Sequence, residues 1–134
     1  MDAQQQHTLW AIAIEHDEVA QLCAQRGWHN VSVACSYYAV YTAMWVALGD
    51  PRQGQWSHAG ILQHFAPGQW RHPSAPLDRT LTRAIRRLYN APVHAQYMGE
   101  RLTNQDSAEG LGTARQVLQL VASTLGFSFG RSTP

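Results

Sequence analysis

The sequence predicts an all-α protein, an up-and-down bundle of four main helices plus one short helix, on three observations. Apolar residues recur at spacings of three and four in the long segments, no strand-like alternation occurs, and glycine and proline separate the segments. The chain of 134 residues, 45% of them hydrophobic, is long enough to bury one core. We therefore expect a single domain over residues 1–134, with its core at about residues 8–125 and flexible ends at 1–7 and 126–134.

The first helix is predicted over residues 8–26, because apolar side chains there recur on one face. The expected inner face consists of Leu9, Ile12, Val19, Leu22 and Cys23, and the acids Glu15, Asp17 and Glu18 are expected on the outer side. Gly27 follows the last helical position, where glycine usually ends a helix. The connection to the next apolar segment is short, so the two helices should be antiparallel neighbours.

The central helix is predicted over residues 31–48, which contain no charged residue, proline or glycine. One side is a narrow seam of small side chains: Cys35, Ala39, Ala43 and Ala47. The other is a bulky face: Ala34, Tyr38, Tyr41, Trp45 and Leu48. A helix that is apolar on both faces is normally buried on both, so we place it at the centre of the bundle. Its tyrosine, serine and threonine content is too polar for a membrane span.

A short third helix is predicted over residues 58–65, with Ser57 as its N-cap. His58, next to this cap, is interpreted as a structural residue. Residues 66–76 contain three prolines and should not form a regular element. Trp56 and Trp70 lie in the neighbouring Gly/Pro-rich connections and suit an exposed contact surface.

The fourth helix is predicted to open at Leu77 and to break or kink near Tyr89. The reason is Pro92, which lacks a backbone N–H and clashes with the preceding turn. Residues 93–102 would then form a second short piece or a loop. The last helix should start at a capping box from Thr103 to Asp106 and run to about residue 125.

The formal net charge of +1, from ten basic and nine acidic residues, gives no global attraction to nucleic acid or to a membrane. The two cysteines form no CxxC pair and have no zinc-site spacing, so we expect no metal and no cofactor. The start of the chain lacks the basic and long apolar segments of a secretory signal. These features favour a cytoplasmic protein with reduced thiols.

All ten basic residues are arginine, and four of them fall within nine positions. Arg79, Arg83 and Arg86 follow the i, i+4, i+7 spacing of one helix face, and Arg87 lies at its border. Such a strip can bind the phosphates of RNA, because guanidinium groups form bidentate hydrogen bonds with them. A solvated helix face with acidic partners is the commoner use of this pattern and is favoured here.

The strongest candidates for catalytic residues are Arg87 and His94, followed by Tyr97. A break at Pro92 could let the Arg87 and His94 side chains converge. His94 could then transfer protons at a ribose 2′-OH or at the leaving oxygen, since histidine titrates near neutrality. Arg87 could hold the scissile phosphate, and Tyr97 could orient His94 or the substrate. On spacing alone, an arginine on a solvated face and a histidine packed under a kink are commoner.

Three stretches in order resemble the HEPN domain (higher eukaryotes and prokaryotes nucleotide-binding) of small stand-alone bacterial proteins. They are SYYAVYTAMWVALGD at 36–50, WSHAGILQHF at 56–65 and LYNAPVHAQY at 88–97. The family shows a YYA-aromatic helix, a Ser/Thr-His-x-Gly-aliphatic segment ending in Phe, and LY-x-x-Arg-x-x-Ala-Asp-Tyr. The resemblance covers about residues 8–122, and the chain departs from the last pattern with Pro92 in place of Arg and Gln96 in place of Asp.

The resemblance implies a HEPN-like bundle that forms homodimers. In HEPN ribonucleases, an arginine and a histidine with four to six residues between them face their counterparts across the dimer and cut RNA without a metal. Arg87 and His94 meet this spacing at its upper limit. Many members are toxins or phage-defence proteins, often paired with a nucleotidyltransferase-like antitoxin, and others act as binding or scaffold modules.

Two functions follow from these residues and this resemblance. The first is a HEPN-type module of a toxin–antitoxin or defence system that binds a partner protein, a nucleotide or RNA, and that can also have ribonuclease activity. The alternative is an active metal-independent endoribonuclease that uses Arg87 and His94 across a homodimer. The residues at positions 92 and 96 favour the binding module. A helical structural subunit of a larger complex is a third possibility.

Overall fold

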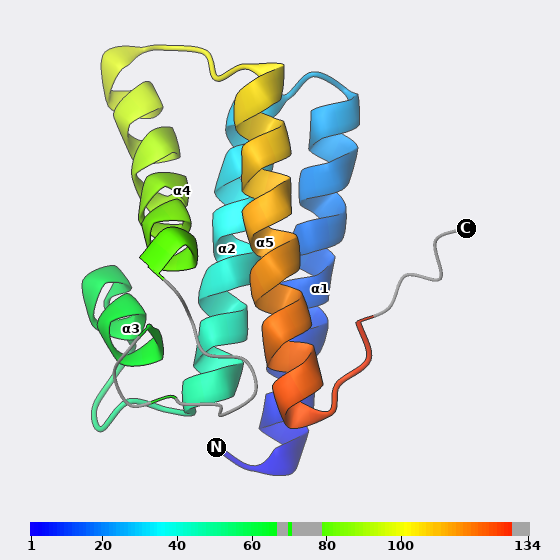
Figure 1. The fold of residues 1–134 in the computed structure, drawn as a ribbon, viewed down its shortest axis with the longest axis vertical. Coiled ribbons are helices and arrows are strands. Elements are labelled where there is room, and N and C mark those ends of the chain that lie inside the picture. The colour runs from blue at the N-terminus through cyan, green and yellow to red at the C-terminus, as the bar shows by residue number, and fades with distance from the viewer. Residues whose placement is uncertain (67–69, 71–78, 130–134) are drawn as a thin grey trace.

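The protein is a helical bundle, which confirms the predicted fold class. The computed structural model describes residues 1–66, 70 and 79–129, and these form five helices and no strand. The helices are α1 (Ala3–Gln25), α2 (His29–Leu48), α3 (His58–Phe65), α4 (Arg79–Met98) and α5 (Asn104–Leu125). Four are long and α3 is short, as predicted. In Figure 1, α2 and α5 lie between α4 on one side and α1 on the other, and α3 lies below α4.

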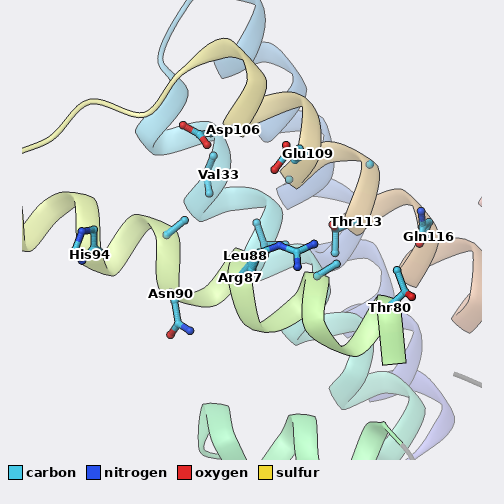
Figure 2. A pocket seen from close by; sticks show the side chains of 14 residues that line it. Val33, Thr80, Arg87, Leu88, Asn90, His94, Asp106, Glu109, Thr113 and Gln116 are labelled. Carbon is cyan, nitrogen blue, oxygen red and sulfur yellow. The ribbon is translucent and has the colours of Figure 1, made fainter. Parts of the chain in front are cut away.

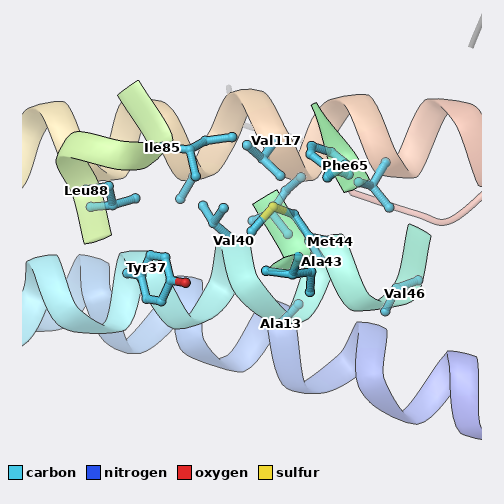
Figure 3. Close-up of a cluster of buried hydrophobic side chains, with 14 of the residues drawn as sticks. Ala13, Tyr37, Val40, Ala43, Met44, Val46, Phe65, Ile85, Leu88 and Val117 are labelled. Atoms are coloured by element: carbon cyan, nitrogen blue, oxygen red, sulfur yellow. The ribbon is translucent and has the colours of Figure 1, made fainter. Parts of the chain in front are cut away.

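The core forms around α2, which packs against each of the other helices. Ala39 and Ala43, from the small seam, are fully buried. Figure 3 shows Val40 and Met44 of α2 facing side chains of α3, α4 and α5, among them Phe65. Helix α2 has the length and apolar composition of a helix that could cross a membrane, but 50% of its most apolar 18-residue segment is buried in the bundle. That burial fits a core helix.

The start and the inner face of α1 both differ from the prediction. The helix begins at Ala3 rather than at residue 8, because Asp2 and Gln5 form a capping box. Its buried residues are Trp10, Ala13, Asp17, Ala20 and Cys23. Ile12, Val19 and Leu22, which were expected inside, are exposed. Small alanines let α1 lie close to α2, where the Ser32 hydroxyl donates to the Ala20 carbonyl (2.7 Å), and this contact turns the larger side chains outward.

Asp17 is a second correction on α1, since this carboxylate was expected on the outer side and is buried. It accepts a hydrogen bond from the Gln21 side-chain amide (2.8 Å), one turn further along the helix. A buried carboxylate needs such partners, because burying a charge without them is costly. Apolar periodicity could not predict the burial of Asp17, because it assigns every acidic residue to the outer side of a helix.

The short helix α3 has the predicted bounds and the predicted cap. The Ser57 hydroxyl accepts from the Gly60 backbone N–H (2.9 Å). Trp56 and Trp70 were expected to form an exposed surface, but both are half-buried against the core. The Trp70 ring stacks on Phe65, with ring centroids 4.7 Å apart. The irregular segment predicted at 66–76 lies largely outside the described residues, as does the predicted start of the fourth helix at Leu77.

A break or a kink was predicted in the fourth helix, and the break is wrong, because α4 continues through Pro92 to Met98. Proline removes the N–H that would bond to the Leu88 carbonyl, at a typical cost of about 3 kcal/mol. Leu88 and Ala95 are buried on either side of it, and Ile85 is buried one turn earlier. This packing keeps both halves helical. Gly99, with φ of 66°, takes the chain out of the helix.

The turn between α4 and α5 is held by one side chain of α2. The Asn30 amide donates to the Glu100 carbonyl (3.1 Å) and accepts from the Leu102 N–H (2.9 Å). The predicted capping box then starts α5, with Thr103 and Asp106 bonded to each other's backbone N–H. These contacts fix the end of α4 relative to the start of α5.

The C-terminal segment was predicted to be loose from residue 126, but its described part packs on α1. Phe127 stacks on the Trp10 ring, with centroids 5.1 Å apart, and Phe129 meets the same ring edge-on at 6.3 Å. The Trp10 N–H donates to the Ser128 carbonyl (3.2 Å). Residues 130–134 lie outside the described residues.

Candidate functional site: a cavity between α4 and α5

A cavity of about 920 Å³ separates α4 from α5. Its floor includes Val33 of α2, and Leu88 and Gly110 from the two walls. A Cβ at Gly110 would lie 3.2 Å from a Leu88 methyl group, so α5 approaches closely at the floor. At Gly112, a Cβ would meet nothing within 4 Å, so the missing side chain leaves open space. The polar and charged lining residues are Thr80, Arg87, Asn90, His94, Asp106, Glu109, Thr113 and Gln116.

Both members of the predicted pair, Arg87 and His94, line this cavity, but the third residue does not. Tyr97 is 90% exposed and lies outside the lining. The predicted convergence across a break at Pro92 is wrong, because α4 is continuous. Seven residues of helix place Arg87 and His94 on one face, about 10 Å apart along the axis. One protomer therefore presents them as two separate contact points.

Arg87 is an exposed arginine on the wall of the cavity formed by α4. It forms no hydrogen bond or ion pair with any other residue that the structure describes. Figure 2 shows its side chain extending from α4 toward the part of α5 that carries Thr113. An arginine with its donors unused, beside polar side chains, can accept a phosphate or a carboxylate in bidentate fashion.

His94 lies at the other end of the cavity (Figure 2). Its Nε2 is 3.5 Å from a carboxylate oxygen of Glu100, and both side chains are largely exposed. An exposed pair of this kind contributes about 0–1 kcal/mol to stability. His94 can exchange this partner for a ligand at little cost.

Two acids in the cavity were not predicted as site residues. Asp106 was recognised only as a helix cap, and its carboxylate does accept from the Thr103 N–H (2.7 Å) and hydroxyl (2.9 Å). Glu109 accepts from the Gln105 side-chain amide (3.0 Å). Their spacing to Thr113 and Gln116, in steps of three and four, is the pattern that could have revealed one polar face of α5.

The other arginines of the cluster lie outside the cavity. Arg79, Arg83 and Arg86 are exposed on α4, and of the four only Arg87 lines the space between the helices. This agrees with the predicted position of Arg87 at the border of the strip. The described residues show no ion pair for the exposed three.

His58 is part of an aromatic cluster between α2, α3 and α4, in line with its structural interpretation. Its Nδ1 hydrogen-bonds with the Tyr37 hydroxyl (2.5 Å), and its ring stacks on Tyr89 with centroids 4.5 Å apart. Burial is the main cause that raises the pKa of Tyr37 well above its usual range, with smaller contributions from Tyr89 and other tyrosines. The hydroxyl therefore stays neutral and serves as a hydrogen-bonding group.

His29 and Ser107 form a contact that the sequence did not suggest. The His29 Nδ1 lies 2.6 Å from the buried Ser107 hydroxyl and joins the first turns of α2 and α5. Among the described residues, no carboxylate hydrogen-bonds to the other ring nitrogen, as a catalytic triad would require. This contact has the character of a structural link.

The described residues contain no group of three or more His, Cys, Asp or Glu side chains that could hold a metal ion. Cys23 and Cys35 are free, and burial together with the nearby Cys23 raises the pKa of the Cys35 thiol. A raised pKa makes a thiol a poorer nucleophile at neutral pH.

Comparison with known proteins gives no further assignment. No protein-family model, no curated protein and no solved structure matches the chain. The α4/α5 cavity, built from the residues above, is therefore the basis on which the function is argued.

Proposed function

We propose that this chain is a HEPN-like binding module whose α4/α5 cavity binds a nucleotide or a nucleotide segment of RNA. The observation that carries the proposal is the Arg87 guanidinium, which has no ion pair with any described residue, in a cavity of about 920 Å³. Cavities of 300–1,000 Å³ are the usual size for small-molecule sites. A cytoplasmic location and a role in a toxin–antitoxin or defence system, with a nucleotidyltransferase-like antitoxin as partner, belong to this proposal through the resemblance.

The mixed charge of the cavity favours a nucleotide over inorganic phosphate. Arg87 can bind the phosphate, whereas Asp106 and Glu109 would repel a bare anion. The same carboxylates can accept hydrogen bonds from the amino groups of a base. A ligand with a phosphate at one end and N–H donors at the other can therefore bind Arg87 of α4 and the two carboxylates of α5.

The test is titration of the pure protein, in EDTA, with each mononucleotide and with a labelled RNA oligomer. Arg87→Ala should weaken binding by about 10- to 100-fold, since a hydrogen bond to a charged group contributes about 1.5–3 kcal/mol. Arg86→Ala is the matched control, because Arg86 is the adjacent arginine and lies outside the cavity lining. Absence of binding by all probes, or equal loss in both variants, would reject the proposal.

The second candidate is a metal-independent endoribonuclease, supported by the presence of Arg87 and His94 on one face of the same cavity. Their separation of about 10 Å makes them unsuited to act on one phosphate within a protomer unless the long Arg87 side chain turns toward His94. Cleavage of an RNA pool in EDTA, lost in His94→Ala and retained in Gln96→Ala, would support this candidate. Cleavage that persists in both Arg87→Ala and His94→Ala would reject these residues as its site.

A further inference from the structure

One face of α2 is open to solvent although it carries no charged residue. Val31 and Tyr38 are exposed, Tyr38 by 50%, and Cys35, Thr42 and Trp45 are half-buried along the same stripe. These positions are spaced by four and three residues in turn, which is the pattern of a helix seam that packs against another helix. The prediction that both faces of this helix are buried is therefore fulfilled on only one side.

The exposed apolar residues of α1 lie beside this stripe. Ile12, Val19 and Leu22 are all exposed, Val19 by 44%. The His16 ring is 5.7 Å from the Tyr38 ring, which places the α1 residues level with the stripe on α2. Together they form one surface, called here the α1/α2 face: Ile12, His16, Val19, Leu22, Val31, Cys35, Tyr38, Thr42 and Trp45.

The α1/α2 face is separate from the α4/α5 cavity. Val33 of α2 lines the cavity, and Val31, two residues away, points to the opposite side because each residue turns the helix by about 100°. Large exposed apolar patches on soluble proteins usually mark an interaction surface. The face therefore calls for a partner of its own, independent of the ligand proposed for the cavity.

We propose that the α1/α2 face is covered by the same face of a second copy, with the two α1 helices antiparallel. The charges on α1 are self-complementary in this arrangement. A two-fold axis midway between Val19 and Leu22 brings Glu15 of one copy to Arg26 of the other, and the pair occurs twice. Glu15 has no ion pair among the described residues. The Arg26 guanidinium lies over the Trp28 ring at 5.4 Å, at the end of the face.

The same axis also matches the exposed aromatic residues. Two contacts, from Ser32 to the Ala20 carbonyl and from His16 to Tyr38, fix which residues of α1 and α2 are level. At that register, the exposed Trp28 of one copy lies opposite Tyr38 of the other. Aromatic residues are enriched in protein interfaces relative to the rest of the surface. One symmetry operation therefore pairs the opposite charges and the large apolar side chains together.

This dimer keeps the two α4/α5 cavities apart, on outward sides of the assembly. It provides a homodimer without placing two Arg87/His94 pairs face to face. The arrangement differs from the composite nuclease site that the resemblance implies, and it holds whether or not the cavity binds a nucleotide.

The test is sedimentation equilibrium of the full chain over a range of concentrations. The wild type should reach a mass of about 30 kDa, twice the 15.0 kDa of one chain. Val19→Glu should raise the dimer dissociation constant at least 100-fold, with unchanged helical circular dichroism. Val93→Glu is the matched control, because Val93 is 53% exposed on α4, outside the face, and its dimer should remain intact.

A charge exchange tests the antiparallel register and does not depend on an apolar core residue. Glu15→Arg and Arg26→Glu should each weaken the dimer, and the double variant should restore it. A wild type that stays monomeric would overturn the proposal. This holds also if the monomer binds phosphatidylcholine–phosphatidylglycerol vesicles in a flotation assay, which would indicate a membrane as the partner of this face. A dimer that withstands Val19→Glu, or a double variant weaker than both single variants, would also overturn the proposal.

Discussion

Tyr37 carries a hydroxyl into the centre of the bundle, where it hydrogen-bonds with His58 (2.5 Å). Burial raises its pKa above that of an unfolded tyrosine, so the folded protein keeps a proton that the unfolded chain releases above about pH 10. We expect the free energy of unfolding to fall as pH rises through this range, by up to about 1.4 kcal/mol per pH unit. Below that range the contribution is fully present.

Tyr37→Phe should make this alkaline decline shallower, at a loss of about 1 kcal/mol at pH 7 for the missing hydrogen bond. Urea unfolding between pH 7 and pH 11 measures both effects. Tyr97→Phe is the control, since the Tyr97 side chain is 90% exposed and its substitution should change neither. An identical pH slope in Tyr37→Phe and the wild type would contradict the assignment.

Individual residues of the site were predictable in part. The sequence singled out Arg87 and His94, and the structure places both in one cavity. It did not single out Glu109, because a polar face on α5 indicates a solvent-exposed helix surface as readily as a site until α4 is known to lie opposite. Tyr97 lies nearly one helical turn after His94, so the sequence placed it at the site. Whether its side chain reaches the cavity depends on how α4 packs, and in the structure it lies outside the lining.

At the scale of the element, Pro92 leaves the Leu88 carbonyl without its helical partner. Pro92→Ala restores the N–H and removes the clash of the ring with the preceding turn. We expect the variant to raise the free energy of unfolding by about 1–3 kcal/mol, measured by urea denaturation. Val93→Ala, at the exposed neighbouring position, should change it by less than about 0.5 kcal/mol. A destabilised Pro92→Ala would show that the proline ring contributes more through packing than it costs.

Two helix caps were predicted correctly, whereas the Asp2–Gln5 box that starts α1 was not. Ser57 and the Thr103–Asp106 box act through short-range hydrogen bonds, which a local sequence specifies completely. The course of α4 was not predictable in the same way. Its continuity depends on Leu88 and Ala95 being buried against other helices, and such tertiary contacts can outweigh the local preference of proline.

At the scale of the whole molecule, the first helix contacts the segment that follows the last helix. The Trp10 ring of α1 stacks on Phe127 beyond α5. Phe127→Ala should lower the free energy of unfolding by about 1–3 kcal/mol, because it removes a half-buried aromatic ring and exposes Trp10. Trp10 fluorescence cannot be read alone among five tryptophans, so denaturant unfolding followed by circular dichroism is the measurement. Leu125→Ala, at a position exposed on α5, is the control and should have a smaller effect.

The bundle as a whole followed from apolar periodicity and short connections, and both are features of the chain itself. The direction in which α1 faces did not follow. Ile12, Val19 and Leu22 are exposed, whereas Ala13 and Ala20 are buried, because close approach to α2 requires small side chains. Hydrophobicity alone ranks leucine above alanine for the core, so the pattern placed Cys23 correctly but put Ile12, Val19 and Leu22 on the wrong side of the helix.

The two hydrogen bonds of Asn30 have a consequence for how the α4/α5 cavity can change its width. They hold α4 at its C-terminal end, so any separation of α4 from α5 is a rotation about that end. A rotation of 10° would move the far end of the helix, about 30 Å away, by about 5 Å, but His94 by only about 1 Å. We therefore expect the cavity to widen more at Thr80 than at His94 when it accommodates a larger ligand.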